Sequence, residues 1–343
     1  MNKKHIVWLV LLLLLLSPSC RQDSLPPPPD FRGYEGNPVI VPGPPGTWDD
    51  LYVIMAFVLE YNDTIYLYYT AYDKPGHRAL GLATSVDGFH FTKYQGNPVL
   101  TGDGMGYDAF GVAQAQILKS DIGWVMYFNG REIAGFSSGP AIGRATAPTL
   151  KGPWKKSEIP VLTTGIRGEW DSDFIYLGPV RKKEDGTYMM YYTSGEHLFP
   201  EGEFYIGMAA SENGINWKKY NDPATADHPF ASSDPVLKTG KPGEWDADIV
   251  LICDLDRQPD GYRLYYSCDS FGYATSEDGI HWKKYSRNPF YIHEDDPYCR
   301  KIGWDELTLQ GAKLLFLDSL CFMYYDYGHC RKSAISMAVS DGK

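Results

Sequence analysis

The chain has 343 residues, of which 43% are hydrophobic and 15% aromatic, so it carries enough apolar surface for a folded core and is not intrinsically disordered. Its 26 tyrosines, 35 glycines and 24 prolines favour strands and tight turns over helices. The formal net charge of −11 argues against nucleic acid as a partner, because phosphate binding needs a basic surface, and a neutral, hydroxyl-rich partner fits better.

Residues 1–20 have the pattern of a secretory signal. Two lysines precede an apolar run from Ile6 to Leu16, which is too short to cross a bilayer, and small residues lead to Cys20. This cysteine resembles the lipidated cysteine of a bacterial lipoprotein signal. We therefore expect an exported bacterial protein, periplasmic or at the cell surface, that meets the membrane only through a lipid anchor on Cys20; simple secretion is the alternative. The proline-rich residues 21–32 are expected to form an extended tether.

The remaining residues, 33–343, repeat one unit five times. Each unit starts with an aromatic residue followed by aspartate, and the starts lie 59 to 75 residues apart. The starts are Trp48-Asp49, Tyr107-Asp108, Trp170-Asp171, Trp245-Asp246 and Trp304-Asp305. Each is followed by an apolar run, a run rich in Tyr or Phe, a short third strand, and a turn such as "EDGIHW" before a fourth strand. The pattern predicts an all-β fold, a five-bladed β-propeller with four-stranded blades.

The fifth unit ends without a fourth strand, whereas "EGNPVIVPG" at 35–43 precedes the first unit with no unit of its own. The N-terminal strand, Pro38 to Val41, is therefore expected to pair with the strand around 334–339 and close the ring. The aspartate of each "DG" turn is expected to form that turn through local backbone N–H groups.

Cysteine count and spacing argue against a metal site. With Cys20 set aside, five cysteines remain, so at least one should be free in an oxidising compartment. We expect a disulfide between Cys299 and Cys330, which both fall at one end of the fifth unit. No Cys/His cluster has the spacing of zinc ligands.

These features resemble the five-bladed propeller glycosidases, the superfamily of glycoside hydrolase families 43, 32 and 130. The resemblance covers residues 33–343 and rests on the five units, the "ATSxDGxxW" turns at 83–91 (with Phe91 in the last place) and 274–282, and the "NPV" strand ends. It implies a monomeric catalytic domain that hydrolyses glycosidic bonds of plant or host oligosaccharides or polysaccharides, exo-acting and inverting, with no cofactor and no metal. A family-130 type glycoside phosphorylase and a non-catalytic carbohydrate-binding propeller are the alternatives.

Comparison among the units separates structural residues from candidate site residues. An aspartate present in every unit is expected to hold the loop that enters the first strand, although a ring of five carboxylates could include functional ones, and Asp108 is kept as a substrate-binding candidate. The next two positions vary, and four units add one acid there: Asp50, Asp173, Asp248 and Glu306. The loops between second and third strands should lie at the same end of the propeller. Their ionisable residues are Asp73, His77, Arg78, Arg131, Glu132, Glu196, His197, Glu201, Glu203, Asp269, Asp326, His329 and Arg331.

Glycosidic cleavage needs one carboxylic acid to protonate the leaving oxygen and one carboxylate to activate water or attack carbon. The resemblance implies Asp50 as base or nucleophile, Glu196 as acid, and Asp173 as pKa modulator or alternative base, with Asp248 as a further alternative. The substrate-binding candidates are Asp108, Arg78, Arg131, Glu132, His197, Asp269 and Glu306. A phosphorylase would need a cationic pocket, for which Arg78, His77 and Arg131 are the candidates.

Overall fold

The computed structural model describes residues 26–73, 76–132, 141–195, 202–297, 299, 308–317, 319–328 and 333–341. This part of the chain is all-β, with two short 3-10 turns. The elements are β1 (Arg32–Gly33), β2 (Tyr52–Tyr61), β3 (Thr64–Tyr72), β4 (Arg78–Ser85), β5 (Thr92–Lys93), β6 (Leu100–Thr101), η1 (Gly106–Asp108), β7 (Gly111–Ser120), β8 (Gly123–Arg131), β9 (Ala141–Ala147), β10 (Lys155–Lys156), β11 (Leu162–Thr163), β12 (Phe174–Lys182), β13 (Tyr188–Gly195), β14 (Tyr205–Ser211), β15 (Lys218–Lys219), β16 (Pro235–Leu237), β17 (Leu251–Gln258), β18 (Gly261–Cys268), β19 (Ser270–Ser276), β20 (Lys283–Lys284), η2 (His293–Asp295), β21 (Thr308–Leu317), β22 (Leu320–Gly328) and β23 (Ile335–Asp341).

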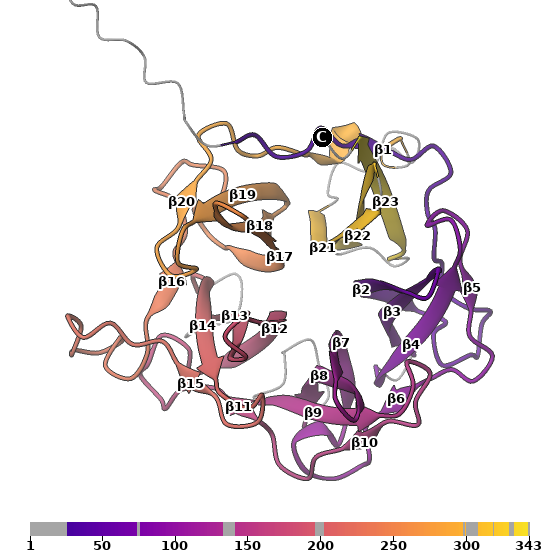
Figure 1. Cartoon of the computed structure of the whole chain (residues 1–343), viewed down its shortest axis with the longest axis horizontal. Helices are drawn as coiled ribbons and strands as arrows, with labels where there is room; N and C mark the ends of the chain where they lie inside the picture. The colour runs from indigo at the N-terminus through magenta and orange to yellow at the C-terminus, as the bar shows by residue number, and fades with distance from the viewer. Residues whose placement is uncertain are drawn as a thin grey trace, which may run out of the picture.

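The strands follow the sequence units. Unit 1 comprises β2–β6, unit 2 β7–β11, unit 3 β12–β16, unit 4 β17–β20 and unit 5 β21–β23, and in each the first three strands form an antiparallel meander. Figure 1 shows the sheets arranged around a common centre, with β2, β7, β12, β17 and β21 nearest to it. No helix in the described part of the chain is long and apolar enough to cross a membrane.

The hydrogen bonds of the described residues define four sheets, since units 1 and 2 share a ten-stranded one. A single parallel bridge between Arg78 of β4 and Gly111 of β7 joins them. This close approach requires glycine: Gly111 has a φ of +143°, and a Cβ there would lie 2.4 Å from the carbonyl oxygen of Arg78.

The N-terminal segment pairs with the last strand, as the sequence predicts. Ile40 forms an antiparallel bridge with Ile335, and Val39 N–H also donates to the Ile335 carbonyl at 2.8 Å. Further upstream, β1 pairs with β23 through Arg32 and Val339. The segment thereby supplies the outer strand that unit 5 lacks.

An asparagine before a cis-proline fixes this outer strand in three units. In unit 1, Asn97 accepts from Leu82 N–H at 2.8 Å and donates to the Leu82 carbonyl at 2.9 Å. Asn37 makes the same two bonds with Met337 of β23, at 2.9 Å each, although 300 residues separate them. Asn288 repeats the arrangement with Tyr273 in unit 4.

The packing between units is the same at each junction. Every one of the five buried apolar clusters combines residues of two consecutive units, and one of them joins β22 and β23 to β2 and β3. At four junctions a buried tyrosine of the second strand donates its hydroxyl to a turn carbonyl of the following unit. The pairs are Tyr68 with Leu150, Tyr127 with Gly214, Tyr191 with Gly279, and Tyr324 of unit 5 with Gly88 of unit 1. The last pair joins the end of the chain to its beginning.

The "DG" turns have the predicted structural role. The Asp278 carboxylate accepts from the N–H groups of Ile280 and His281 at 2.8 and 2.9 Å, and Asp87 makes the same bonds in unit 1. Both turns therefore use their aspartate for local backbone bonding.

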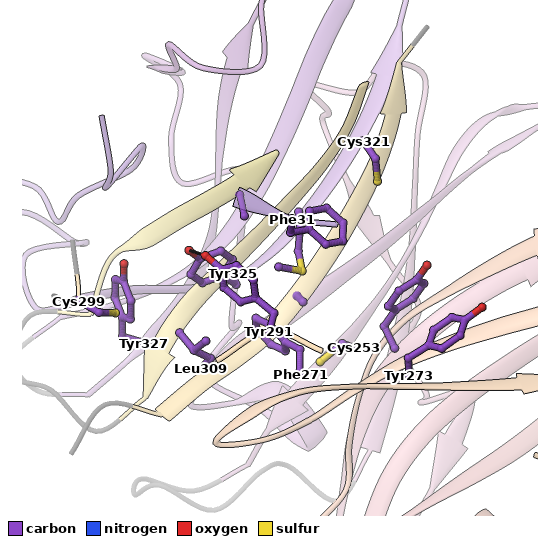
Figure 2. Close-up of a cluster of buried hydrophobic side chains, with 14 of the residues drawn as sticks. Phe31, Cys253, Phe271, Tyr273, Tyr291, Cys299, Leu309, Cys321, Tyr325 and Tyr327 are labelled. Atoms are coloured by element: carbon purple, nitrogen blue, oxygen red, sulfur yellow. Dashed lines mark hydrogen bonds between the residues drawn. The ribbon is translucent and has the colours of Figure 1, made fainter. Parts of the chain in front are cut away.

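Figure 2 shows the apolar cluster between units 4 and 5, in which Phe31 of the N-terminal segment packs among Tyr291, Tyr325 and other buried side chains. Cys253, Cys299 and Cys321 belong to it as free thiols. The expectation of at least one free cysteine is confirmed. The expected disulfide between Cys299 and Cys330 is wrong, because Cys299 is a buried free thiol; Cys330 itself lies outside the described residues.

Candidate active site

The recurrent aspartate at the start of units 1 to 4 is structural. Asp49 is buried and pairs with Lys93 of the short outer strand at 2.6 Å, beside Trp48, which stacks on Tyr69 with ring centroids 5.9 Å apart. The same ion pair, at 2.5 to 2.6 Å, links Asp108 to Lys156, Asp171 to Lys219, and Asp246 to Lys284. The sequence interpretation is confirmed for four units. Asp108, also a substrate-binding candidate, is 2% exposed and shares this supporting role.

Asp50 bonds within its own loop. Its Oδ2 accepts from Gly46 N–H at 2.7 Å, across the turn that leads into β2. Its Oδ1 is buried with no hydrogen-bond partner among the described residues. This geometry gives Asp50 a turn-stabilising contact.

Four other acidic candidates lie exposed where inner strands begin and second strands finish, which we call the entry end. Asp173 precedes β12, and its N–H donates to the Gly195 carbonyl at 3.3 Å. Asp248 lies shortly before β17, Glu132 follows β8, and Asp269 forms the turn between β18 and β19 with a φ of +59°. Asp173 and Asp248 are therefore open to solvent in two neighbouring units.

Glu196, His197 and Glu306 lie outside the described residues. Among the residues that are described, no group of three or more His, Cys, Asp and Glu side chains is placed to hold a metal ion.

The structure brings Arg78 and Arg131 together at the entry end. One row of paired residues runs across units 1 and 2: Tyr52, Tyr72, Arg78, Gly111 and Arg131. The Arg78 guanidinium lies 4.4 Å from the centre of the Tyr72 ring, a cation–π contact. Arg78 is 5% and Arg131 1% exposed, so both charges are largely removed from water.

The pKa shifts show that these groups interact. Burial and, to a smaller extent, the like charge of Arg78 lower the pKa of Arg131 to about 10, against the opposing influence of Tyr72 and Tyr176. Burial raises the pKa of Tyr72 to about 12, against the attraction of both arginines, while Tyr176 of β12 and Asp326 of β22 act in the upward direction. Tyr72, Arg78 and Arg131 thus form one arginine–tyrosine cluster of units 1 and 2, within the electrostatic influence of Tyr176.

Asp326 is a buried acid for which the sequence predicts no role. It is 1% exposed, and burial raises its pKa to about 7, although the bond from Met55 N–H opposes the shift. A carboxyl group with such a pKa can hold or release a proton near neutrality. The available signal was its place after two aromatic residues of the second strand, where other units have Thr70, Asn129, Thr193 and Ser267.

A cavity of about 180 Å³ lies at the other end of β7, lined by Lys119, Ser120, Arg144 and Tyr188 among others. It is separate from the arginine–tyrosine cluster, which lies at the start of that strand.

No protein-family model matches the chain. An uncharacterized protein of Mycobacterium tuberculosis is 22% identical over 255 residues, spanning 70% of this chain and 77% of that protein.

Solved structures of carbohydrate-active enzymes share the fold. A candidate glycosidase from Bacteroides thetaiotaomicron superposes with a TM-score of 0.69 at 19% identity, covering 91% of this chain and 97% of the other. A structure from the GH130 family of mannoside phosphorylases, which contains glycoside hydrolases that target β-1,2 mannosidic linkages in Candida mannan, gives 0.67 at 19% identity over 91% and 94%. A thermostable family-43 glycoside hydrolase gives 0.59 at 16% identity over 88% and 91%. The expected resemblance to the propeller glycosidase superfamily is thus confirmed for the fold.

Proposed function

We propose that this protein is a glycoside hydrolase that cleaves glycosidic bonds of plant or host oligosaccharides or polysaccharides. The observation that carries the proposal is that the arginine–tyrosine cluster of units 1 and 2 lies at the entry end, the same end of the inner strands as the exposed carboxylates of units 3 and 4. A sugar-cleaving site needs this combination, because aromatic faces and charged donors bind the ring while carboxyl groups transfer protons.

Asp173 and Asp248 are our candidates for the carboxylate that activates water. Both side chains are exposed at the entry end, whereas Asp50 is half-buried and the recurrent aspartates of units 1 to 4 are buried. Glu196 remains the proposed acid, on the resemblance alone. Exo action and inversion of configuration belong to the same proposal.

The architectural proposal is a closed five-bladed propeller at 33–343. Support comes from the five inter-unit cores, the pairing of Ile40 with Ile335, and the bond from Tyr324 to Gly88. We propose in addition that residues 1–20 are a lipoprotein-type signal and that the protein is an exported monomer anchored through Cys20. The tether expected at 21–32 ends before Phe31, because Phe31 is buried in a core cluster and Arg32 pairs with Val339 of β23.

The test is a screen of p-nitrophenyl glycosides and plant oligosaccharides against the purified chain, with products separated by chromatography. The proposal expects release of a reducing sugar, and a loss of kcat of at least about 100-fold in Asp173→Asn or Asp248→Asn. The matched control is Asp260→Asn, at an exposed acid in the turn between β17 and β18, which should leave turnover unchanged. Sugar binding without turnover would favour the non-catalytic alternative, and an inert protein would refute the proposal.

A glycoside phosphorylase is the second candidate. The placement of Arg78 and Arg131 on either side of Gly111 favours it. Two buried guanidinium groups in one cluster are suited to an anion, because each offers several N–H donors in a fixed plane. His77 does not join them, since its exposed side chain lies against Asp73, with Nδ1 3.0 Å from Asp73 Oδ2. A phosphorylase would require inorganic phosphate for cleavage and release a sugar 1-phosphate, whereas a hydrolase would be equally active without phosphate.

A further inference from the structure

The cavity at the end of β7 away from the arginine–tyrosine cluster lies between units 2 and 3, and we call it the unit 2–3 cavity. Its volume of about 180 Å³ is enough for a single six-membered ring, because a protein cavity of about 150 Å³ holds benzene. The polar side chains that line it belong to both units and are Lys119, Ser120, Asp121, Arg144, Tyr188 and Asn213.

Arg144 of β9 occupies a position at which the other four units carry an apolar or aromatic side chain. It pairs with Tyr127 of the second strand, and the residues that pair with the equivalent tyrosines are Leu82, Met208, Tyr273 and Met337. The fold therefore does not require a cation at this position.

The turn that faces Arg144 lacks the acid that its counterparts carry. At this junction the tyrosine beside Arg144 donates its hydroxyl to the carbonyl of Gly214, the residue after Asn213. The equivalent turns at two other junctions have Asp87 and Asp278 in place of the asparagine. Asn213 Oδ1 accepts from two backbone N–H groups at 2.9 Å each, as the aspartates do, and brings no charge. The chain thus places a cation at the one of these three turns that has no carboxylate.

Two polar atoms of the cavity wall are buried without a hydrogen-bond partner among the described residues. They are Ser120 Oγ and Arg144 Nε. A buried polar atom normally has a partner, because without one it loses its hydration and gains nothing in return. Since both side chains line the same cavity, one acceptor group bound there can satisfy both atoms.

The charges of the cavity favour a carboxylate as that acceptor. Arg144 and Lys119 carry two positive charges and Asp121 one negative charge, so the lining has one net positive charge, which matches a monoanion. A guanidinium presents N–H donors in a fixed plane that fit the two oxygens of a carboxylate. Tyr188 adds an aromatic surface against which a sugar ring can pack.

We propose that the unit 2–3 cavity is a second sugar-binding site, which takes a uronic acid residue of a glycan and holds its carboxylate on Arg144 and Ser120. Because the cavity lies at the opposite end of β7 from the entry end, it can hold one part of a glycan without obstructing the residue that is cleaved. The choice of an anion rests on the cavity itself, whereas the choice of a sugar rests on the proposed function.

The experiment titrates the full chain with sodium D-glucuronate and sodium D-galacturonate, followed by saturation-transfer difference NMR, with D-glucose and D-galactose as the neutral counterparts. Arg144→Met introduces the side chain that units 3 and 5 carry at this position, so the fold should accept it. Ser120→Ala removes the second donor and keeps the charge. The matched control is Arg167→Met, at an exposed arginine that does not line the cavity. Tm is measured for each variant.

We expect a uronate to bind more tightly than its neutral counterpart, and Arg144→Met to weaken uronate binding at least about tenfold, Ser120→Ala about threefold. Arg167→Met should bind as the wild type does, and Arg144→Met should have a Tm no lower than that of the wild type. All three variants should cleave a neutral aryl glycoside at the wild-type rate, because none of these residues lies at the entry-end site.

Three results would overturn the assignment and leave the proposed function standing: no binding of either uronate, equal binding of the neutral sugars, or uronate binding that Arg144→Met retains. The last of these would place the carboxylate elsewhere, with the arginine–tyrosine cluster as the next candidate. A wild-type protein that cleaves no glycoside but binds a uronate through Arg144 would refute the proposed function and support the second site.

Discussion

Replacing Asn37 by alanine tests whether the N-terminal segment is an integral part of unit 5. The Asn37 amide makes three bonds: two with the backbone of Met337, at 2.9 Å each, and one to Asp296 Oδ2 at 3.0 Å. A neutral bond contributes about 1 kcal/mol and one to a carboxylate about 1.5 to 3 kcal/mol. Because Asn37 is only half-buried, water recovers part of this sum, and we expect a loss of about 2 to 4 kcal/mol in the free energy of unfolding.

Urea unfolding followed by tryptophan fluorescence measures this loss, and the matched control is Asn97→Ala. Asn97 makes the same two backbone bonds in unit 1 and a third to the hydroxyl of Tyr69 at 3.2 Å. At about 2 °C per kcal/mol, both variants should lower Tm by roughly 4 to 8 °C. If Asn97→Ala loses stability and Asn37→Ala does not, the segment is dispensable and the reasoning about ring closure is wrong.

Three further predictions concern acidic residues. The pKa of Asp326 is raised to about 7 from an unfolded value near 4, so its neutral form stabilises the fold at low pH, and up to about 4 kcal/mol of the free energy of unfolding should be lost as pH rises from about 4 through 7. Urea unfolding across pH measures this loss, and Asp326→Asn should remove it. Lys219→Met should destabilise the protein by about 3 to 5 kcal/mol, because it leaves the buried Asp171 carboxylate without its cation. The double variant with Asp171→Asn should recover much of that loss, and additive effects of the two changes would contradict the pairing. Asp50→Asn should weaken the Gly46 turn by about 1 kcal/mol and leave kcat on a cleaved aryl glycoside within threefold, whereas a loss of 100-fold would restore Asp50 as the base.

The repeated features of the fold could be predicted because each one recurs in the sequence. Five aromatic-Asp starts identify the aspartates as structural, and their lysine partners lie in the "TK" or "KK" pairs that end the third-strand turns. The displaced "NPV" segment likewise identifies Asn37 as the counterpart of Asn97 and Asn288. Recurrence carries this information because similar junctions need similar contacts.

The site was harder to predict because it depends on departures from the repeat. Asp50 is an acid where units 2, 3 and 4 have alanine or serine, which favours a functional role. Its carboxylate nevertheless accepts from Gly46 N–H in its own loop, a contact that the sequence does not predict. Asp326 departs from its equivalents as well, but the group that it binds, Met55 N–H, belongs to a strand 271 residues away in the sequence. The shared sheet of units 1 and 2 was missed because it depends on one backbone bridge at Gly111, for which the sequence has no pattern.

The four tyrosine hydroxyl bonds between units all point the same way round, from a second strand to the unit that follows it, and the bond from Tyr324 to Gly88 continues this direction across the two ends of the described chain. In this contact the junction between units 5 and 1 is equivalent to three others, so these bonds do not require the chain to be interrupted at that junction. A circularly permuted chain, with its natural ends joined and new ends opened in the exposed turn at 241–244, would keep every one of these contacts.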